Sequence, residues 1–163
     1  MRRPILPTVA VALALVLAVP AGAAEKVTER DRFRLWNDCR PMELVVEDLS
    51  KDAAAIGLTT EAITVAVRSR LRAARLYLSN DGLPFFSVSV NVGRAAVSIQ
   101  VGYLKLLLDS ASGEVSGAVT WRSGVAGTHG RDASFIRSAV VGQVDKFIDE
   151  YLRVNADACG NSN

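Results

Sequence analysis

The clearest pattern in the chain is a strict alternation of apolar and polar residues on either side of Gly93-Arg94. Every second residue is apolar from 86 to 92, and the alternation resumes from 97 to 103. A period of two predicts half-buried strands, and the glycine between them predicts a tight hairpin. The parity slips at residues 104–106, which predicts a β-bulge or the end of strand pairing.

Two more strands are predicted on shorter patterns. Residues 42–47 place three apolar side chains on one face of a first strand. Residues 115–121 follow a hairpin loop at 109–114 and place Val115, Val119 and Trp121 on one side of a fourth strand. The glycine-rich stretch that begins at Trp121 and ends at Arg131 is predicted to be a loop.

Apolar residues recur at helical spacing in two long segments, which predicts amphipathic helices. The first runs from a Thr59 cap to about Leu76, and the second covers residues 134–154. Their apolar stripes are Ile63, Val67, Leu71 and Ala74 in the first helix, and Ile136, Val140, Val144, Phe147, Tyr151 and Val154 in the second. The element order is β-α-β-β-β-α. It predicts an α+β two-layer sandwich: a mixed four-stranded sheet with both long helices on one face.

The N-terminus has the form of a cleavable export signal. A basic Met1-Arg2-Arg3 precedes the apolar residues 5–19, and Pro20 and Ala21-Gly22-Ala23 follow. The apolar run is shorter than the roughly 20 residues of a spanning helix. We therefore predict a signal peptide at residues 1–23, cleaved before Ala24 or at the next bond, rather than a membrane anchor.

No cysteine follows the small residues, so a lipid anchor is not expected, and the predicted location is periplasmic or secreted without stable membrane insertion. Without Arg2 and Arg3, the 19 Lys and Arg become 17 and match the 17 Asp and Glu. A nucleic-acid-binding domain normally carries a clear basic excess, so nucleic acid is not an expected partner.

The two cysteines, Cys39 and Cys159, lie near the two ends of the exported part. An even count behind an export signal predicts a disulfide, and the wide separation excludes a Cys-x-x-Cys redox motif. We expect a polar, frayed lead-in at residues 24–36, one disulfide-closed domain at 37–159 and a tail at 160–163.

The predicted loop is the first candidate ligand site. It combines glycines with cationic side chains ahead of a helix N-terminus, an arrangement that can hold an anion. The candidate residues are Trp121, Arg122, Gly127, Thr128, His129, Gly130 and Arg131. The alternative is a simple connection in which Asp132 or Ser134 caps the helix. No P-loop motif, nucleophile elbow or second histidine is present, so no catalytic residue, metal or cofactor is predicted. An enzyme that uses His129 is the alternative function.

Arg68, Arg72 and Arg75 share the helix face opposite the apolar stripe, as a basic ridge. The ridge could bind an anionic envelope component or another envelope protein, or it could be an ordinary solvated face. The same projection places Arg70 on the core side, where we expect a buried ion pair with Glu43 or Glu47. The alternative is that its side chain extends to the edge of the sheet and keeps the guanidinium group in solvent.

Two further surfaces have alternative uses. The residues expected on the open sheet face are Phe85, Ser87, Ser89, Asn91, Ser98, Gln100 and Thr120, which form either a solvated surface or a shallow binding surface. The apolar run at residues 104–108 is expected to pack under the helices. If it extends past the sheet, it becomes a partner or dimer contact.

Three segments resemble an uncharacterised family of small exported bacterial proteins. They are Arg68–Tyr77, Thr120-Trp121 with Gly127–Gly130, and Asp145–Asn155 leading to Cys159. The order of elements also resembles the N-terminal domain of TolB and the lipoprotein activators of peptidoglycan synthases. These resemblances imply an envelope binding or accessory module with no particular activity.

Overall fold

The four strands form one mixed sheet whose spatial order, β1-β2-β3-β4, follows the chain. The computed structural model describes residues 26–79 and 84–160. β1 pairs in parallel with β2, and the β2–β3 and β3–β4 pairs are antiparallel. The strands are Glu43–Val46 (β1), Phe85–Val92 (β2), Ala96–Leu108 (β3) and Val115–Thr128 (β4). The predicted mixed sheet is confirmed.

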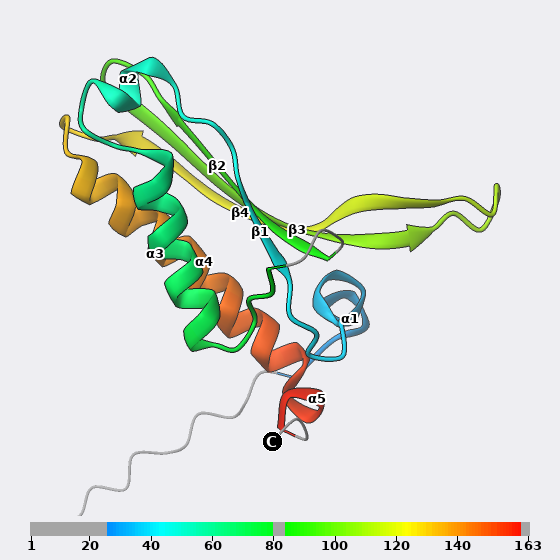
Figure 1. The fold of residues 1–163 in the computed structure, drawn as a ribbon. Helices are drawn as coiled ribbons and strands as arrows, with labels where there is room; N and C mark the ends of the chain where they lie inside the picture. Colours follow the sequence, from blue (N-terminus) through cyan, green and yellow to red (C-terminus); the bar gives the residue numbers. More distant parts are fainter. Residues whose placement is uncertain (1–25, 80–83, 161–163) are drawn as a thin grey trace, which may run out of the picture.

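Two long helices cover one face of this sheet, which confirms the two-layer α+β sandwich (Figure 1). The helices are Glu29–Leu35 (α1), Lys51–Ala54 (α2), Thr60–Ala73 (α3), Ala133–Val154 (α4) and Ala156–Gly160 (α5). The Thr59 hydroxyl caps α3 by accepting the amide hydrogen of Ala62, as the sequence predicts.

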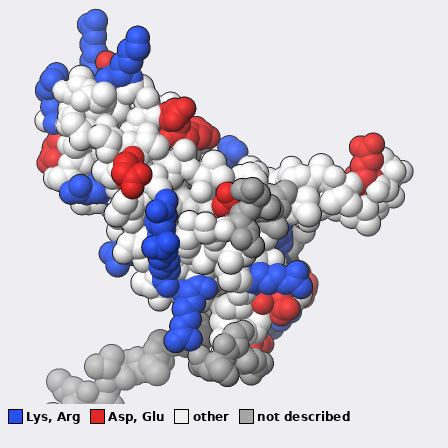
Figure 2. All heavy atoms as spheres, in the orientation of Figure 1, with Lys and Arg blue, Asp and Glu red and all other residues white. Residues whose placement is uncertain are grey.

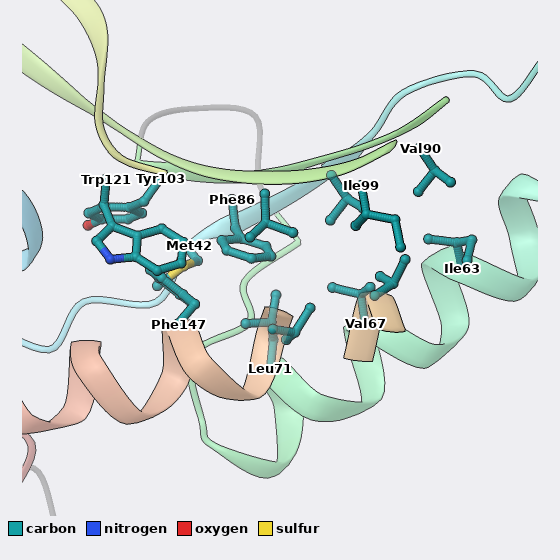
Figure 3. Packing of buried hydrophobic residues seen from close by; sticks show 14 of the residues in the cluster. Met42, Ile63, Val67, Leu71, Phe86, Val90, Ile99, Tyr103, Trp121 and Phe147 are labelled. Atoms are coloured by element: carbon teal, nitrogen blue, oxygen red, sulfur yellow. The ribbon is translucent and has the colours of Figure 1, made fainter. Parts of the chain in front are cut away.

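The core lies between the helices and the inner face of the sheet. Ile63, Val67 and Leu71 of α3 are fully buried, and every residue of the predicted stripe of α4 is buried as well. Phe147 is at the aromatic centre, with its ring centroid 4.5 Å from Phe86 and 5.2 Å from Trp121 (Figure 3). Both periodic patterns therefore identify the correct buried faces.

β4 is longer than predicted. Every residue from Trp121 to Thr128 pairs with β3, so this stretch is strand rather than the predicted loop. Its glycines are compatible with an edge strand, which has one neighbour. Position 124 requires glycine in this pairing, because a Cβ there would lie 2.6 Å from the Ile99 carbonyl oxygen. The register shift between Tyr103 and Leu104 confirms the predicted β-bulge. It also shows that Val115, Val119 and Trp121 do not share one side of β4, because Trp121 faces inward while Val119 faces outward.

Beyond this shift the β3–β4 hairpin bends away from the helices and projects from the body (Figure 1). We call residues 104–119 the arm. The expected packing of residues 104–108 under the helices is wrong, because the helices end before the arm begins to project. Leu106 and Leu108 are 57% and 66% exposed.

The expected frayed lead-in contains α1, which begins with a capping box formed by Thr28 and Asp31. Three other elements satisfy the carbonyl groups at the end of α1. The Lys105 ammonium donates to the carbonyl oxygens of Phe33 (2.6 Å) and Trp36 (3.3 Å), Thr120 donates to that of Arg34 and Asn155 donates to that of Leu35. Burial in this contact lowers the pKa of Lys105. The base of the arm is thereby joined to the N-terminal helix.

The Cys39–Cys159 disulfide is present, with the two Cα atoms 5.1 Å apart, and it joins residues 120 positions apart. The predicted signal peptide at residues 1–23 lies outside the described residues, as do residues 161–163 of the predicted tail. Within residues 26–79 and 84–160, no helix combines the length and apolar character needed to cross a bilayer.

Acidification is expected to loosen α1. Hydrogen bonds from the Thr28 amide and hydroxyl, and then the charge of Arg153, lower the pKa of Asp31 from 3.8. Because the folded pKa is depressed, the stabilisation is complete above the unfolded value and disappears as the pH falls through the folded one. Amide protection factors across α1 should therefore decrease as the pH is lowered beyond about 3.8. Asp31→Asn should show low protection at all pH values. The same acid loss in that variant would assign the effect to another carboxyl group.

Candidate functional site

The residues of the predicted ligand loop do not converge on one site. Trp121 is buried, and its indole N–H donates to a Glu150 carboxylate oxygen at 2.7 Å, so it belongs to the core. Arg122 faces the outer side of the sheet, while Gly127 and Thr128 form the exposed end of β4. The sequence pattern did not reveal that residues 121–128 form a strand. It therefore could not show that neighbouring side chains in this stretch point to opposite faces of the sheet.

His129 is 3% exposed and has a structural role. One ring nitrogen, Nδ1, accepts the Arg131 amide hydrogen, and the other, Nε2, lies 3.0 Å from the Gly93 carbonyl oxygen. This pattern corresponds to a neutral imidazole that carries its hydrogen on Nε2. The histidine thus joins the β2–β3 turn to the start of α4, and backbone groups occupy both of its nitrogens.

The turn before α4 is shaped by Gly130 and Arg131, which have φ angles of 53° and 60°. Asp132 then caps α4 by accepting hydrogen bonds from the Ser134 hydroxyl and the Ser134 and Phe135 amides. These bonds lower the pKa of Asp132. The capping alternative is confirmed, and the carboxylate occupies the helix N-terminus where an anion would have to bind.

Arg70 is not buried, so the expected ion pair with Glu43 or Glu47 is wrong. Its Nε lies 3.4 Å from a carboxylate oxygen of Asp145 on α4, and both side chains are about half exposed. Arg70 lies on α3 beside α4. A projection of one helix shows which side chains share a face, but it does not show where the neighbouring helix lies. An exposed pair of this kind contributes roughly 0–1 kcal/mol.

Arg68 and Arg72 follow the solvent side of α3 as predicted, and Figure 2 shows basic side chains in a column over this helix. Arg75 follows the end of α3 and has a φ angle of 59°. The ridge and the outer sheet face lie on different layers of the sandwich, so they are separate surfaces.

The outer sheet face is uncovered by helices and is hollowed where the sheet bends. A depression of about 260 Å³ lies there, and both edge strands contribute to it. Gly102 lies in it, and a Cβ at that position would approach the Ser87 hydroxyl to 2.9 Å. A charged residue from each edge, Glu47 and Arg122, also lines it. The remaining lining residues are Val45, Phe85, Ser87, Ser89, Gln100, Val101, Leu104 and Val119.

Of the residues expected on this face, six are correctly placed by the strand register. Thr120 is the exception, because it occupies the bulge and its hydroxyl donates to the Arg34 carbonyl oxygen at 2.7 Å. The expectation of a polar outer face holds for the half of the sheet that lies away from the arm.

The same face becomes apolar along the arm. Pairing of Leu104 with Val119 and of Leu108 with Val115 puts these residues on one side, together with Leu106. We call these five residues the arm face. Apart from half-buried Leu104, their exposed fractions lie between 44% and 66%. On the side seen in Figure 2, the projecting part of the arm shows no charged side chain between its base and its acidic tip.

The tip of the arm is a turn stabilised by Asp109, which accepts hydrogen bonds from the Ala111 amide and the Ser112 hydroxyl. These bonds lower the pKa of Asp109. The tip therefore carries two acidic side chains, Asp109 and exposed Glu114. Among the described residues, no group of three or more histidine, cysteine, aspartate or glutamate side chains is placed to hold a metal ion.

No protein-family model matches the chain, and no curated protein is significantly similar to its sequence. The solved structures with distant similarity include two bacterial lipoproteins. A minor lipoprotein from Acinetobacter baumannii is 12% identical at a TM-score of 0.34, over 71% of this chain and 93% of the other. Rare lipoprotein B from Shewanella oneidensis is 9% identical at a TM-score of 0.27, over 71% and 97% of the two chains. The chain is thus a disulfide-bonded α+β domain with distant structural similarity to bacterial lipoproteins.

Proposed function

We propose that the protein is an exported accessory module of the cell envelope that docks onto a partner protein through the arm face and the adjoining hollow. The supporting observation is the arm face itself. Its five apolar side chains lie on one side of a hairpin that projects away from the core they could otherwise join. Contiguous apolar surface of this kind is typical of protein interaction sites.

The chemistry of the arm indicates the kind of partner. Burying a leucine side chain contributes roughly 1.5–3 kcal/mol, so Leu106 and Leu108 could anchor a complex. The acidic tip favours a partner with an apolar surface bordered by basic groups. β4 is also an edge strand, whose unpaired backbone groups could accept a strand from that partner.

The disulfide supports the exported location. Disulfides persist in oxidising compartments such as the periplasm and are rare in a reducing cytosol. The bond between Cys39 and Cys159 therefore fits the predicted export signal.

The geometry favours a binding module over the alternative enzyme. A general base needs a nitrogen that can reach a substrate, and both nitrogens of His129 contact the backbone. The outer sheet face, in contrast, is not covered by helices.

A photocrosslinking amino acid at position 106 is expected to capture a discrete protein partner in the native envelope. The same amino acid at position 65 is the matched control, because Val65 is similarly exposed, at 53%, but lies on α3. Adding Leu108→Glu should reduce the capture at position 106 several-fold without changing the melting temperature. Val65→Glu should leave it unchanged.

Equal capture at positions 106 and 65, or none at either, would contradict the proposal. Crosslinks only between two copies of the chain would replace the partner protein with a dimer contact.

A further inference from the structure

Two arginines of the basic ridge are stacked on one aromatic ring. The guanidinium carbons of Arg68 and Arg72 lie 5.7 Å and 4.9 Å from the centroid of the Tyr77 ring. The two arginines are four residues apart, so they lie one above the other on α3. Stacking of this kind orients each planar guanidinium group.

The end of α3 places the ring in this position. The chain reverses at Arg75, whose left-handed conformation ends the helix, and the Leu76 amide donates back to the Leu71 carbonyl oxygen. Tyr77 then forms a parallel β-bridge with Met42, the residue that precedes β1. The tyrosine is therefore fixed to the sheet while its ring lies against the helix.

Within residues 26–79 and 84–160, neither of these two arginines forms an ion pair. In the described part of the chain, the recorded ion pairs involve Arg70 and Arg153, and neither involves Arg68 or Arg72. The single carboxylate between residues 60 and 78, Glu61, is at the opposite end of α3. Buried Nε of Arg68 also has no hydrogen-bond acceptor among the described residues.

Two like charges at this spacing destabilise a helix by a few tenths of a kcal/mol. The stacking offsets part of that cost, and no carboxylate of the described residues forms an ion pair with either guanidinium group. Preoriented guanidinium groups suit tetrahedral phosphate oxygens, which they bind through paired, charge-assisted hydrogen bonds.

We propose that Arg68 and Arg72, stacked on Tyr77, form a binding site for a phosphate group of an anionic envelope component. The phosphate could belong to a lipid headgroup or to a soluble phosphorylated molecule. The site lies on α3 and does not depend on the docking role proposed for the arm.

A competing explanation is that these arginines only complement the negative end of the α3 dipole. Lysine would serve that purpose equally well, because it carries the same charge. It would not reproduce the planar, paired donors of arginine. Arginine-to-lysine variants therefore separate the two explanations.

The test is an NMR titration of the purified, disulfide-bonded protein with inorganic phosphate and pyrophosphate at constant ionic strength. We expect saturable shifts of the arginine Nε–H signals and of the amides from Arg68 to Tyr77. Arg68→Lys and Arg72→Lys should each weaken binding about tenfold. Arg70→Lys, on the same helix but paired with Asp145, should bind as the wild type does.

Tyr77→Leu should weaken binding in the same way, while Tyr77→Phe, which keeps the ring, should preserve it. Vesicles of phosphatidylcholine with and without phosphatidylglycerol identify the source of the phosphate. If inorganic phosphate displaces the protein only poorly from the anionic vesicles, the phosphate belongs to a lipid headgroup. Efficient displacement indicates a soluble phosphorylated molecule.

Unchanged binding by both the Arg68→Lys and the Arg72→Lys variant would overturn the proposal, as would an equal loss in Arg70→Lys. The proposal would also be overturned if potassium chloride at the same ionic strength produced the same shifts, because the ridge would then be an ordinary solvated face. None of these readouts involves the arm, so each proposal can fail without the other.

Discussion

Replacing both Cys39 and Cys159 by serine is expected to lower the free energy of unfolding by about 4–5 kcal/mol. The bond joins positions 120 residues apart, so its removal releases nearly the whole domain in the unfolded state. The entropy of closing so long a loop accounts for the size of the expected loss. Urea unfolding monitored by tryptophan fluorescence measures it.

The wild-type protein in a reducing agent provides the matched comparison, because it breaks the same bond without any substitution. Both forms should unfold at the same, lower urea concentration. A loss below about 1 kcal/mol in both would show that the unfolded state is restricted by other means.

Replacing Asn155 by leucine is expected to cost about 3–4 kcal/mol, although leucine has a similar size. Asn155 is 1% exposed. Its side-chain oxygen accepts from the amides of Asn37 (2.9 Å) and Cys39 (3.4 Å), and its nitrogen donates to the carbonyl oxygens of Leu35 and Tyr151. Leucine would leave buried backbone groups without partners, which is the costly part of the change.

Asn91→Leu is the control, because Asn91 is exposed on β2, and its effect should lie within about 0.5 kcal/mol. Thermal and urea unfolding of the two variants test the comparison. Similar midpoints would mean that water replaces the Asn155 amide, so that its hydrogen bonds add little.

The two changes act on one strained turn and should not be additive. Asp38 and Cys39 both have φ angles of 54°, a left-handed conformation that is unfavourable for residues other than glycine. The Asn155 amide and the disulfide hold this turn from two sides. Tyr151 supports it by donating to the Arg40 carbonyl oxygen, and burial raises the pKa of this tyrosine to about 12.

The sequence by itself determined the elements whose buried faces repeat regularly. The alternation around Gly93-Arg94 predicted the β2–β3 hairpin, and the stripes of α3 and α4 predicted the core. The cysteine pair predicted the disulfide. These features depend on local periodicity or on the chemistry of one residue type, both of which can be read without knowing which segments meet.

The tertiary structure alone decided the features that depend on a neighbouring element. The bulge at Thr120 turned Trp121 into the core and left Val119 outside, because one extra residue reverses the parity of a strand. The partner of Arg70 and the four hydrogen bonds of Asn155 depend on how α4 lies beside other segments. The sequence left open whether residues 104–108 pack under the helices or extend past the sheet. The structure decided this, because the exposure of these side chains depends on where the two long helices end.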